Sequence, residues 1–216
     1  MMTTSTMNDN PMQRLLAGLA PATLARLFAG GAIGLLVWEI WARVFTKWVL
    51  GYPLEPAGLI DAIAQHQLGL SVPYLLREAL HYAVGIIGYP VAYFVLSRLN
   101  RNVGFWLDGI VFATFTLAVA AMFIAGKGSM GIGLFWLVVT AFIATRFINP
   151  SHRLRETISW GTFTWLNALG LMAPLGGLSF YLLGEGGDLS FMSFVGHVIY
   201  GFIAAWLFEH WMAKAV

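Results

Sequence analysis

Apolar stretches long enough to cross a lipid bilayer recur along the whole chain, and they restrict its fold more than any other feature. The 216 residues are 59% hydrophobic and only 10% charged, whereas soluble domains carry about 25% charged residues. Backbone polar groups in lipid must be satisfied within each segment, and these segments are too long and too continuously apolar for strands of a membrane barrel. The sequence therefore predicts an all-α, multi-pass membrane helix bundle.

We expect about six transmembrane helices, near residues 24–48, 74–97, 103–125, 129–148, 157–183 and 190–211. They would form one transmembrane domain, 23–212, after a flexible N-terminal tail, 1–22. Pro174 and the glycines around it predict a kink or a break in the fifth segment.

The basic residues predict the orientation of the helices. One side, with the N-terminus, would carry Arg14, Arg26, Arg98, Arg101, Arg146, Arg153, Arg155 and Lys214. The other side would carry Arg43, Lys47, Arg77 and Lys127. Because basic residues concentrate in cytoplasmic loops, both termini are expected in the cytoplasm.

The connection 49–73 is punctuated by Pro53, Pro56 and Pro73. Within it, residues 57–68 place apolar side chains at helical spacing. This pattern predicts a short amphipathic helix that lies on the outer membrane face or caps a cavity.

Two histidines, His81 and His197, lie inside apolar segments, and each precedes a glycine by four residues. An ionisable side chain at membrane depth is costly and therefore indicates a function. Each histidine lies seven residues into its segment, which is about 10 Å below the outer surface at helical rise. Glu39 is expected at a similar depth in the first segment.

Three further charged residues lie near these groups. Arg43 follows Glu39 by four residues, and Arg77 precedes His81 by four, with Glu78 adjacent. If the first, second and sixth segments meet, the sequence predicts one outward-facing ligand-binding cluster, made of Glu39, Arg43, Arg77, Glu78, His81 and His197. The alternatives are charges that reach the headgroups and histidines that only link helices by hydrogen bonds.

Small residues at helical spacing predict close helix packing at Gly30, Gly34, Gly85 and Gly201. Arg146, Arg153 and Arg155 could bind anionic lipid headgroups, or they could serve only as the positive charge that sets topology.

Two kinds of cofactor are compatible with these side chains. Two histidines on different helices could ligate haem b, and zinc could use Glu39 as a third ligand, although no spacing requires either. The chain has no cysteine, which excludes thiol catalysis and cysteine-ligated metal. It has no catalytic motif and no feature of nucleic-acid binding, so we expect a protein that is not an enzyme.

The stretch Gly196-His197-Val198-Ile199-Tyr200-Gly201, the stretch His81-Tyr82-Ala83-Val84-Gly85 and the glycine-rich first segment resemble the YagU-like small bacterial inner-membrane proteins of unknown function. The resemblance implies a location in the bacterial inner membrane and brings no established reaction.

These observations predict a non-enzymatic membrane protein with an outward-facing polar pocket, acting as a small transporter, permeation or sensing component. One alternative is an accessory subunit of a larger electron-transfer or photosynthetic complex, and another is a haem-binding membrane protein. The expected partners are the lipid bilayer and, in addition, other membrane subunits or further copies of the chain.

Overall fold

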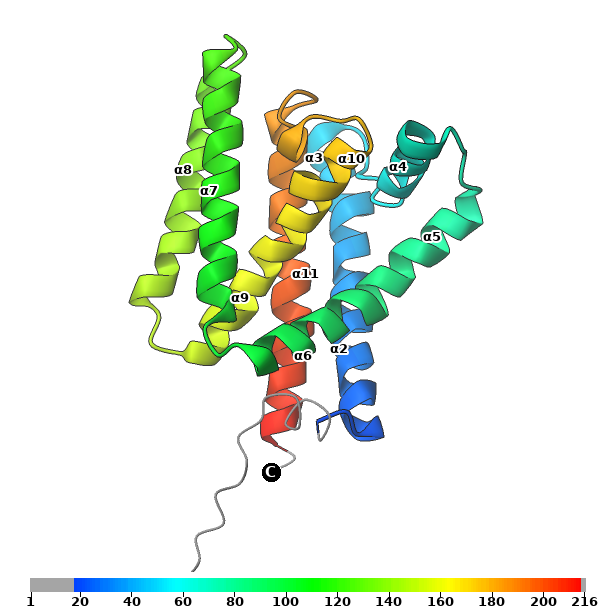
Figure 1. The fold of residues 1–216 in the computed structure, drawn as a ribbon, viewed down its shortest axis with the longest axis vertical. Helices are drawn as coiled ribbons and strands as arrows, with labels where there is room; N and C mark the ends of the chain where they lie inside the picture. Colours follow the sequence, from blue (N-terminus) through cyan, green and yellow to red (C-terminus); the bar gives the residue numbers. More distant parts are fainter. Residues whose placement is uncertain (1–17, 215–216) are drawn as a thin grey trace, which may run out of the picture.

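A computed structural model describes residues 18–214, and the regular structure within that range is all helical, without strands. The all-α prediction is therefore confirmed. The helices run up and down a bundle, and α2 (Pro21–Ile40) begins at the end where α11 (Gly187–Ala213) finishes (Figure 1). We call this the terminal end, and the opposite end the cavity end. Most of the predicted tail, 1–22, lies outside the described residues.

Three long helices each contain a π-helical segment. The first consists of α2, η1 (Trp41–Phe45) and α3 (Thr46–Leu50); the second of α5 (Tyr74–Ala83), η2 (Val84–Gly88) and α6 (Tyr89–Leu99); the fifth of α9 (His152–Trp165), η3 (Leu166–Met172) and α10 (Ala173–Leu175). The remaining elements are α4 (Gly58–Leu68), α7 (Val103–Ile124), α8 (Met130–Ile148), the 3₁₀ turn η4 (Phe180–Leu182) and α11.

Five helices in the described part are long and apolar enough to cross a membrane: Pro21–Leu50, Tyr74–Leu99, Val103–Ile124, Met130–Ile148 and Gly187–Ala213. The fifth helix is not among them, because its first half carries buried polar side chains such as Thr157, Ser159 and Thr162. These side chains face neighbouring helices, so this helix does not need a continuously apolar sequence.

The predicted bounds of the fifth segment, 157–183, are wrong. The helix begins at His152 and ends at Leu175, and Gly177 then adopts a positive φ of 77°. The chain continues through η4 instead of extending the helix. The polar sequence after His152 concealed the true start, and the prediction ran past the turn that follows Pro174.

Glycines bring the first helix into close contact with α11. A Cβ atom on Gly30 would lie 2.7 Å from the carbonyl oxygen of Ala204, and one on Gly34 would lie 3.0 Å from that of Tyr200. On another face of α2, a Cβ on Gly31 would lie 2.7 Å from the carbonyl oxygen of Ile86. The first helix is thus held between α11 and the second helix at distances that only glycine permits.

The other glycines predicted to pack also lie at helix contacts. Gly201 of α11 meets the backbone of Gly161 in α9, and a Cβ on Gly161 would lie 2.7 Å from the Cα of Val198. In η2, a Cβ on Gly85 would lie 2.8 Å from a methyl carbon of Leu35. The structure therefore places Gly30, Gly34, Gly85 and Gly201 where helices approach closely.

The π-helical segment η2 has a backbone explanation. The N–H of Tyr89 donates to the carbonyl oxygen of Val84, five residues earlier. In the same register the carbonyl of Gly85 would accept from residue 90, but Pro90 has no N–H. The Tyr200 hydroxyl supplies the missing donor, at 2.6 Å from the Gly85 carbonyl oxygen. A side chain of α11 thereby compensates the irregular turn.

Close packing at Gly201 can be tested against a glycine with free space. We expect Gly201→Ala to lower the free energy of unfolding by about 1–3 kcal/mol, because its methyl group meets a backbone that cannot move aside. Gly109→Ala in α7 is the control, since a Cβ there has nothing within 4 Å, and it should be neutral or stabilising by up to about 1 kcal/mol. The measurement is denaturant unfolding in mixed micelles. Equal effects of the two substitutions would contradict the packing.

Candidate ligand-binding cavity

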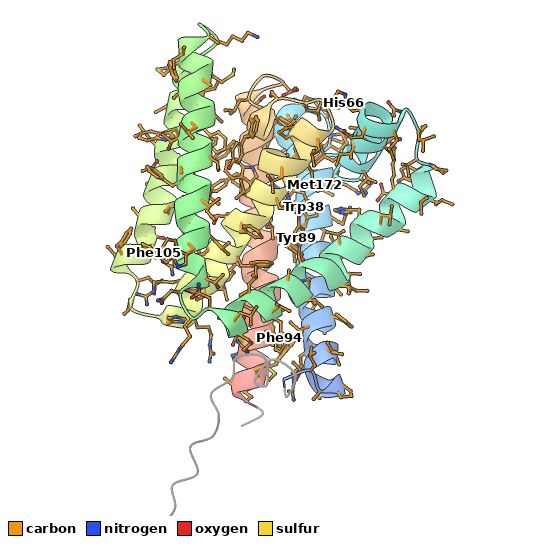
Figure 2. The ribbon with its side chains drawn as sticks, viewed as in Figure 1. Trp38, His66, Tyr89, Phe94, Phe105 and Met172 are labelled. Carbon is orange, nitrogen blue, oxygen red and sulfur yellow. The ribbon has the colours of Figure 1, made fainter. Side chains whose placement is uncertain are left out.

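A cavity of about 400 Å³ lies towards the cavity end of the bundle. Figure 2 shows Trp38, Tyr89 and Met172, from the first, second and fifth helices, in the middle of the bundle. The cavity is lined by residues from these helices, from α4 and the loop before it, and from α11 and the segment that leads into it: Trp38, Tyr52, Pro53, Leu54, Glu55, Pro56, Gly58, Leu59, Ile60, His81, Val84, Tyr89, Ala168, Leu169, Met172, Leu178, Leu182, Glu185, Leu189, Ser193 and His197. Most of this lining is apolar, in contrast to the predicted polar pocket.

Helix α4 forms part of the cavity wall at this end. It is tied to the second helix by Asp61, whose carboxylate lies 3.6 Å from the Arg77 guanidinium. It is tied to the fifth helix by Gln67, which donates to the carbonyl oxygen of Leu175 at 2.8 Å. Residues 58–60 line the cavity. The short helix expected in the connection 49–73 therefore exists and covers a cavity.

His197 presents one ring nitrogen to the cavity. Its Nδ1 lies 2.9 Å from the carbonyl oxygen of Ser193, one turn earlier in α11. A carbonyl only accepts, so Nδ1 carries the proton, and Nε2 of the neutral ring keeps its lone pair. Nε2 has no hydrogen-bond partner among the described residues. The Trp38 ring, 4.4 Å from the imidazole between centroids, fixes the ring further.

His81 is held in the opposite tautomer. Its Nε2 lies 2.9 Å from the Glu39 carboxylate, which accepts a hydrogen bond from the Nε2–H group. Nδ1 of His81 is then the acceptor of the neutral ring, and no partner for it occurs in the described part of the chain.

The two histidines also share a smaller space. A cavity of about 30 Å³ is lined by His81, His197, Trp38, Tyr89 and Tyr200, among others. This volume is sufficient for about one water molecule. Two oriented imidazoles therefore flank a site where a single water, or the polar end of a ligand, could bridge them.

Arg43 links the first and second helices beside the cavity. Its Nε donates to Glu39 in the same helix, and its Nη2 donates to Glu78 of α5 at 2.9 Å. The two carboxylate side chains are 15% and 13% exposed, while that of Arg43 is 37% exposed. We call Glu39, Arg43, Glu78 and His81 the cavity-end network.

Four of the six residues of the predicted cluster thus belong to one network. The first, second and sixth of the predicted segments do meet, as that cluster required. Arg77 lies elsewhere, paired with Asp61 of α4. His197 is separated from the carboxylates and joins His81 only by lining the same cavities.

A second arginine network, at the terminal end, was not predicted. Arg146 of α8 donates to Asp108 of α7 at 3.1 Å, to Glu156 of α9 at 2.6 Å and to Ser159 at 2.7 Å. Glu156 also accepts from the backbone N–H of Gly104 at 2.6 Å. We call these residues the terminal-end network. Asp108 alone could have signalled it, because a carboxylate in an apolar segment needs a partner.

The three arginines considered for headgroup binding differ in position. The side chain of Arg146 is 11% exposed and is used within the terminal-end network. Arg155 donates to the carbonyl oxygen of Asn149 at 3.1 Å. Arg153 is exposed and lines a hollow near Arg98. Of the three, only Arg153 has an exposed side chain, as binding to a lipid headgroup would require.

The donor set does not fit the metal alternatives. The described residues contain no group of three or more His, Asp or Glu side chains that could hold a metal ion, so zinc with Glu39 is not supported. Haem ligation needs two imidazole lone pairs directed at one iron. Here His81 uses Nε2 for Glu39 and His197 uses Nδ1 for its own helix, so the rings offer unlike nitrogens.

Comparison with known proteins adds no identification: no family model, curated protein or solved structure matches this chain.

Loss of Arg146 should destabilise the bundle strongly. We expect Arg146→Gln to lower the free energy of unfolding by about 3–5 kcal/mol, because two buried carboxylates lose their cation. Adding Asp108→Asn should recover part of this loss. Lys127→Gln is the control, because the Lys127 side chain is exposed and makes no hydrogen bond or ion pair within the described part. It should change the free energy of unfolding by less than about 0.5 kcal/mol. Similar losses in both single variants, measured by denaturant unfolding in micelles, would contradict the network.

Proposed function

We propose that this chain is a multi-pass membrane protein that binds a small, mostly apolar molecule in the cavity, as a transport, permeation or sensing component. The observation that carries the proposal is the cavity itself. Its volume of about 400 Å³ lies within the range of about 300–1,000 Å³ found for small-molecule sites. Its walls are mostly apolar and include a few polar groups, among them His81 and His197. Small-molecule sites usually have this composition.

The polar groups define the polar end of the ligand. The hydrogen bonds made by Nδ1 of His197 and Nε2 of His81 leave Nε2 of His197 and Nδ1 of His81 as the acceptors that face a ligand. A ligand with a hydroxyl or amine donor satisfies these acceptors, whereas one ending in a carbonyl does not. The proposed ligand is therefore an apolar body with one hydrogen-bond donor.

The helices around the cavity supply the means to adjust to a ligand. The first, second and fifth helices each contain a π-helical segment, and residues of η2 and η3 line the cavity. Such segments occur frequently at functional sites. We infer that binding shifts these three helices locally and that this shift is what a transporter or sensor uses.

In the membrane, we propose six crossings with both termini in the cytoplasm and the cavity in the outer half. The excess of basic residues at the terminal end supports this orientation. The fifth helix would cross the membrane surrounded by the other helices and not by lipid. The YagU-like resemblance supports a bacterial inner membrane.

The orientation can be tested because the chain has no cysteine of its own. A single cysteine at Lys127, between α7 and α8, should react with a membrane-impermeant maleimide added to intact spheroplasts. A cysteine at Arg101, between α6 and α7, should react only after the membrane is opened. The reverse pattern would overturn the proposed orientation, and labelling of both sites in intact spheroplasts would overturn the crossing of α7.

Ligand binding can be tested on protein extracted with its surrounding lipid. We expect mass analysis to find an apolar molecule with a hydroxyl or amine group, and His197→Phe to reduce its amount about tenfold, because one buried hydrogen bond is worth about 1.4 kcal/mol. His210→Phe is the matched control, since it removes a histidine of the same helix that does not line the cavity. Absence of such a molecule from wild-type protein, or equal amounts in both variants, would refute the proposed binding.

A further inference from the structure

The second and fifth helices meet beside the cavity and then diverge. Their lower contact is a hydrogen bond from the Asn167 amide to the Tyr89 hydroxyl, at 2.8 Å. Beyond it towards the cavity end, α5 leans away from α10, and the two helices form a V (Figure 1). They are connected again through α4, by the contacts of Asp61 with Arg77 and of Gln67 with Leu175.

These contacts frame one side of the cavity wall, which we call the side window. It has η2 on one edge and η3 on the other, the Tyr89–Asn167 bond below and α4 above. Val84 of η2 lines the cavity and is nevertheless 40% exposed. Met172, at the end of η3, lines the same cavity and is partly exposed. Each edge of the side window therefore contributes one residue that both lines the cavity and is partly exposed.

The surroundings of the side window are apolar. On the exposed face of the second helix, Leu80 is 43% exposed and Ile87 is 47% exposed, on either side of Val84. Leu171, next to Met172, is 51% exposed. A helix surface of this kind, in a helix long enough to cross a membrane, faces lipid tails. A second approach to the cavity, past Tyr52 and Glu55, has polar groups at its rim.

We propose that an apolar alcohol dissolved in the bilayer enters the cavity sideways through the side window. The inference rests on the proposed ligand binding and adds the ligand's source and route. An alcohol of this kind partitions into lipid before it meets the protein, since each buried CH₂ favours transfer from water by about 0.8 kcal/mol. From the bilayer it meets Val84 and Met172 directly, and its hydroxyl then reaches His197 at the inner wall.

The test uses a reporter cysteine at Ser193, which lines the cavity next to His197. Protein with Ser193→Cys is placed in lipid nanodiscs, so that both membrane faces are accessible. It is treated with N-cyclohexylmaleimide, which is neutral and enters lipid, or with a sulfonated maleimide, which stays in water. Lys127→Cys, in an exposed loop, gives the reference ratio of the two rates.

We expect the ratio of the two labelling rates, neutral over sulfonated, to be at least tenfold higher at Ser193→Cys than at Lys127→Cys. Adding Val84→Trp should slow the neutral reagent about tenfold by narrowing the side window. Adding Leu80→Trp should not, because Leu80 has a similar exposure, lies one turn away and does not line the cavity. Met172→Trp provides a second block from the opposite edge, in case Val84→Trp does not fold.

The outcomes separate the two proposals. One outcome is that Ser193→Cys gives the same rate ratio as Lys127→Cys and that neither Val84→Trp nor Met172→Trp slows the neutral reagent. This outcome would place the entrance at the polar rim and overturn the lateral route, but it would leave ligand binding intact. Failure of both reagents to label Ser193→Cys in folded protein would show a closed cavity and overturn both proposals.

Discussion

The close approach of α2 to α11 is the contact on which the rest of the structure depends. Gly30 and Gly34 leave no room for a larger residue, because a Cβ atom would meet carbonyl oxygens of α11 at 2.7 and 3.0 Å. With the two backbones this near, Trp38 lies over Gly196 and packs against the ring of His197. Glu39, the next residue, faces the second helix and orients His81. One helix contact thus positions both histidines.

The cavity follows from how the backbone is satisfied near the prolines. In the second helix, Pro90 cannot donate to Gly85, and Tyr200 does so instead. The fifth helix repeats the arrangement, because Ala173 donates to the carbonyl of Ala168, five residues earlier, and Pro174 follows. Both π-helical segments border the cavity. The wider turns of a π-helical segment space side chains less regularly than an α-helix does. Neighbouring helices therefore do not fill all the space beside these segments, and the cavity lies there.

Individual groups could be predicted from the sequence better than their partners could. His81, His197 and Glu39 stand out because ionisable side chains are rare in apolar segments. Spacing showed that Arg77 and His81 share a helix face. It could not show that Arg77 would form an ion pair with Asp61, which belongs to a separate short helix. The start of the fifth helix was missed for a related reason. Hydropathy detects contact with lipid, and residues such as Thr157 and Ser159 contact protein instead.

The two arginine networks are alike in composition and unlike in exposure. Each has one arginine between two carboxylates, yet the Arg43 side chain is 37% exposed and that of Arg146 is 11% exposed. Breaking a buried pair costs about 3–5 kcal/mol, because it leaves a charge without its partner. The cavity-end pairs are intermediate, since the Glu39 and Glu78 side chains are mostly buried while Arg43 reaches the surface. Rearrangement therefore costs less at the cavity end than at the terminal end. The proposed side window also lies towards the cavity end, so the lateral route would need rearrangement only where it costs less, while the terminal-end network holds the opposite end of the bundle together.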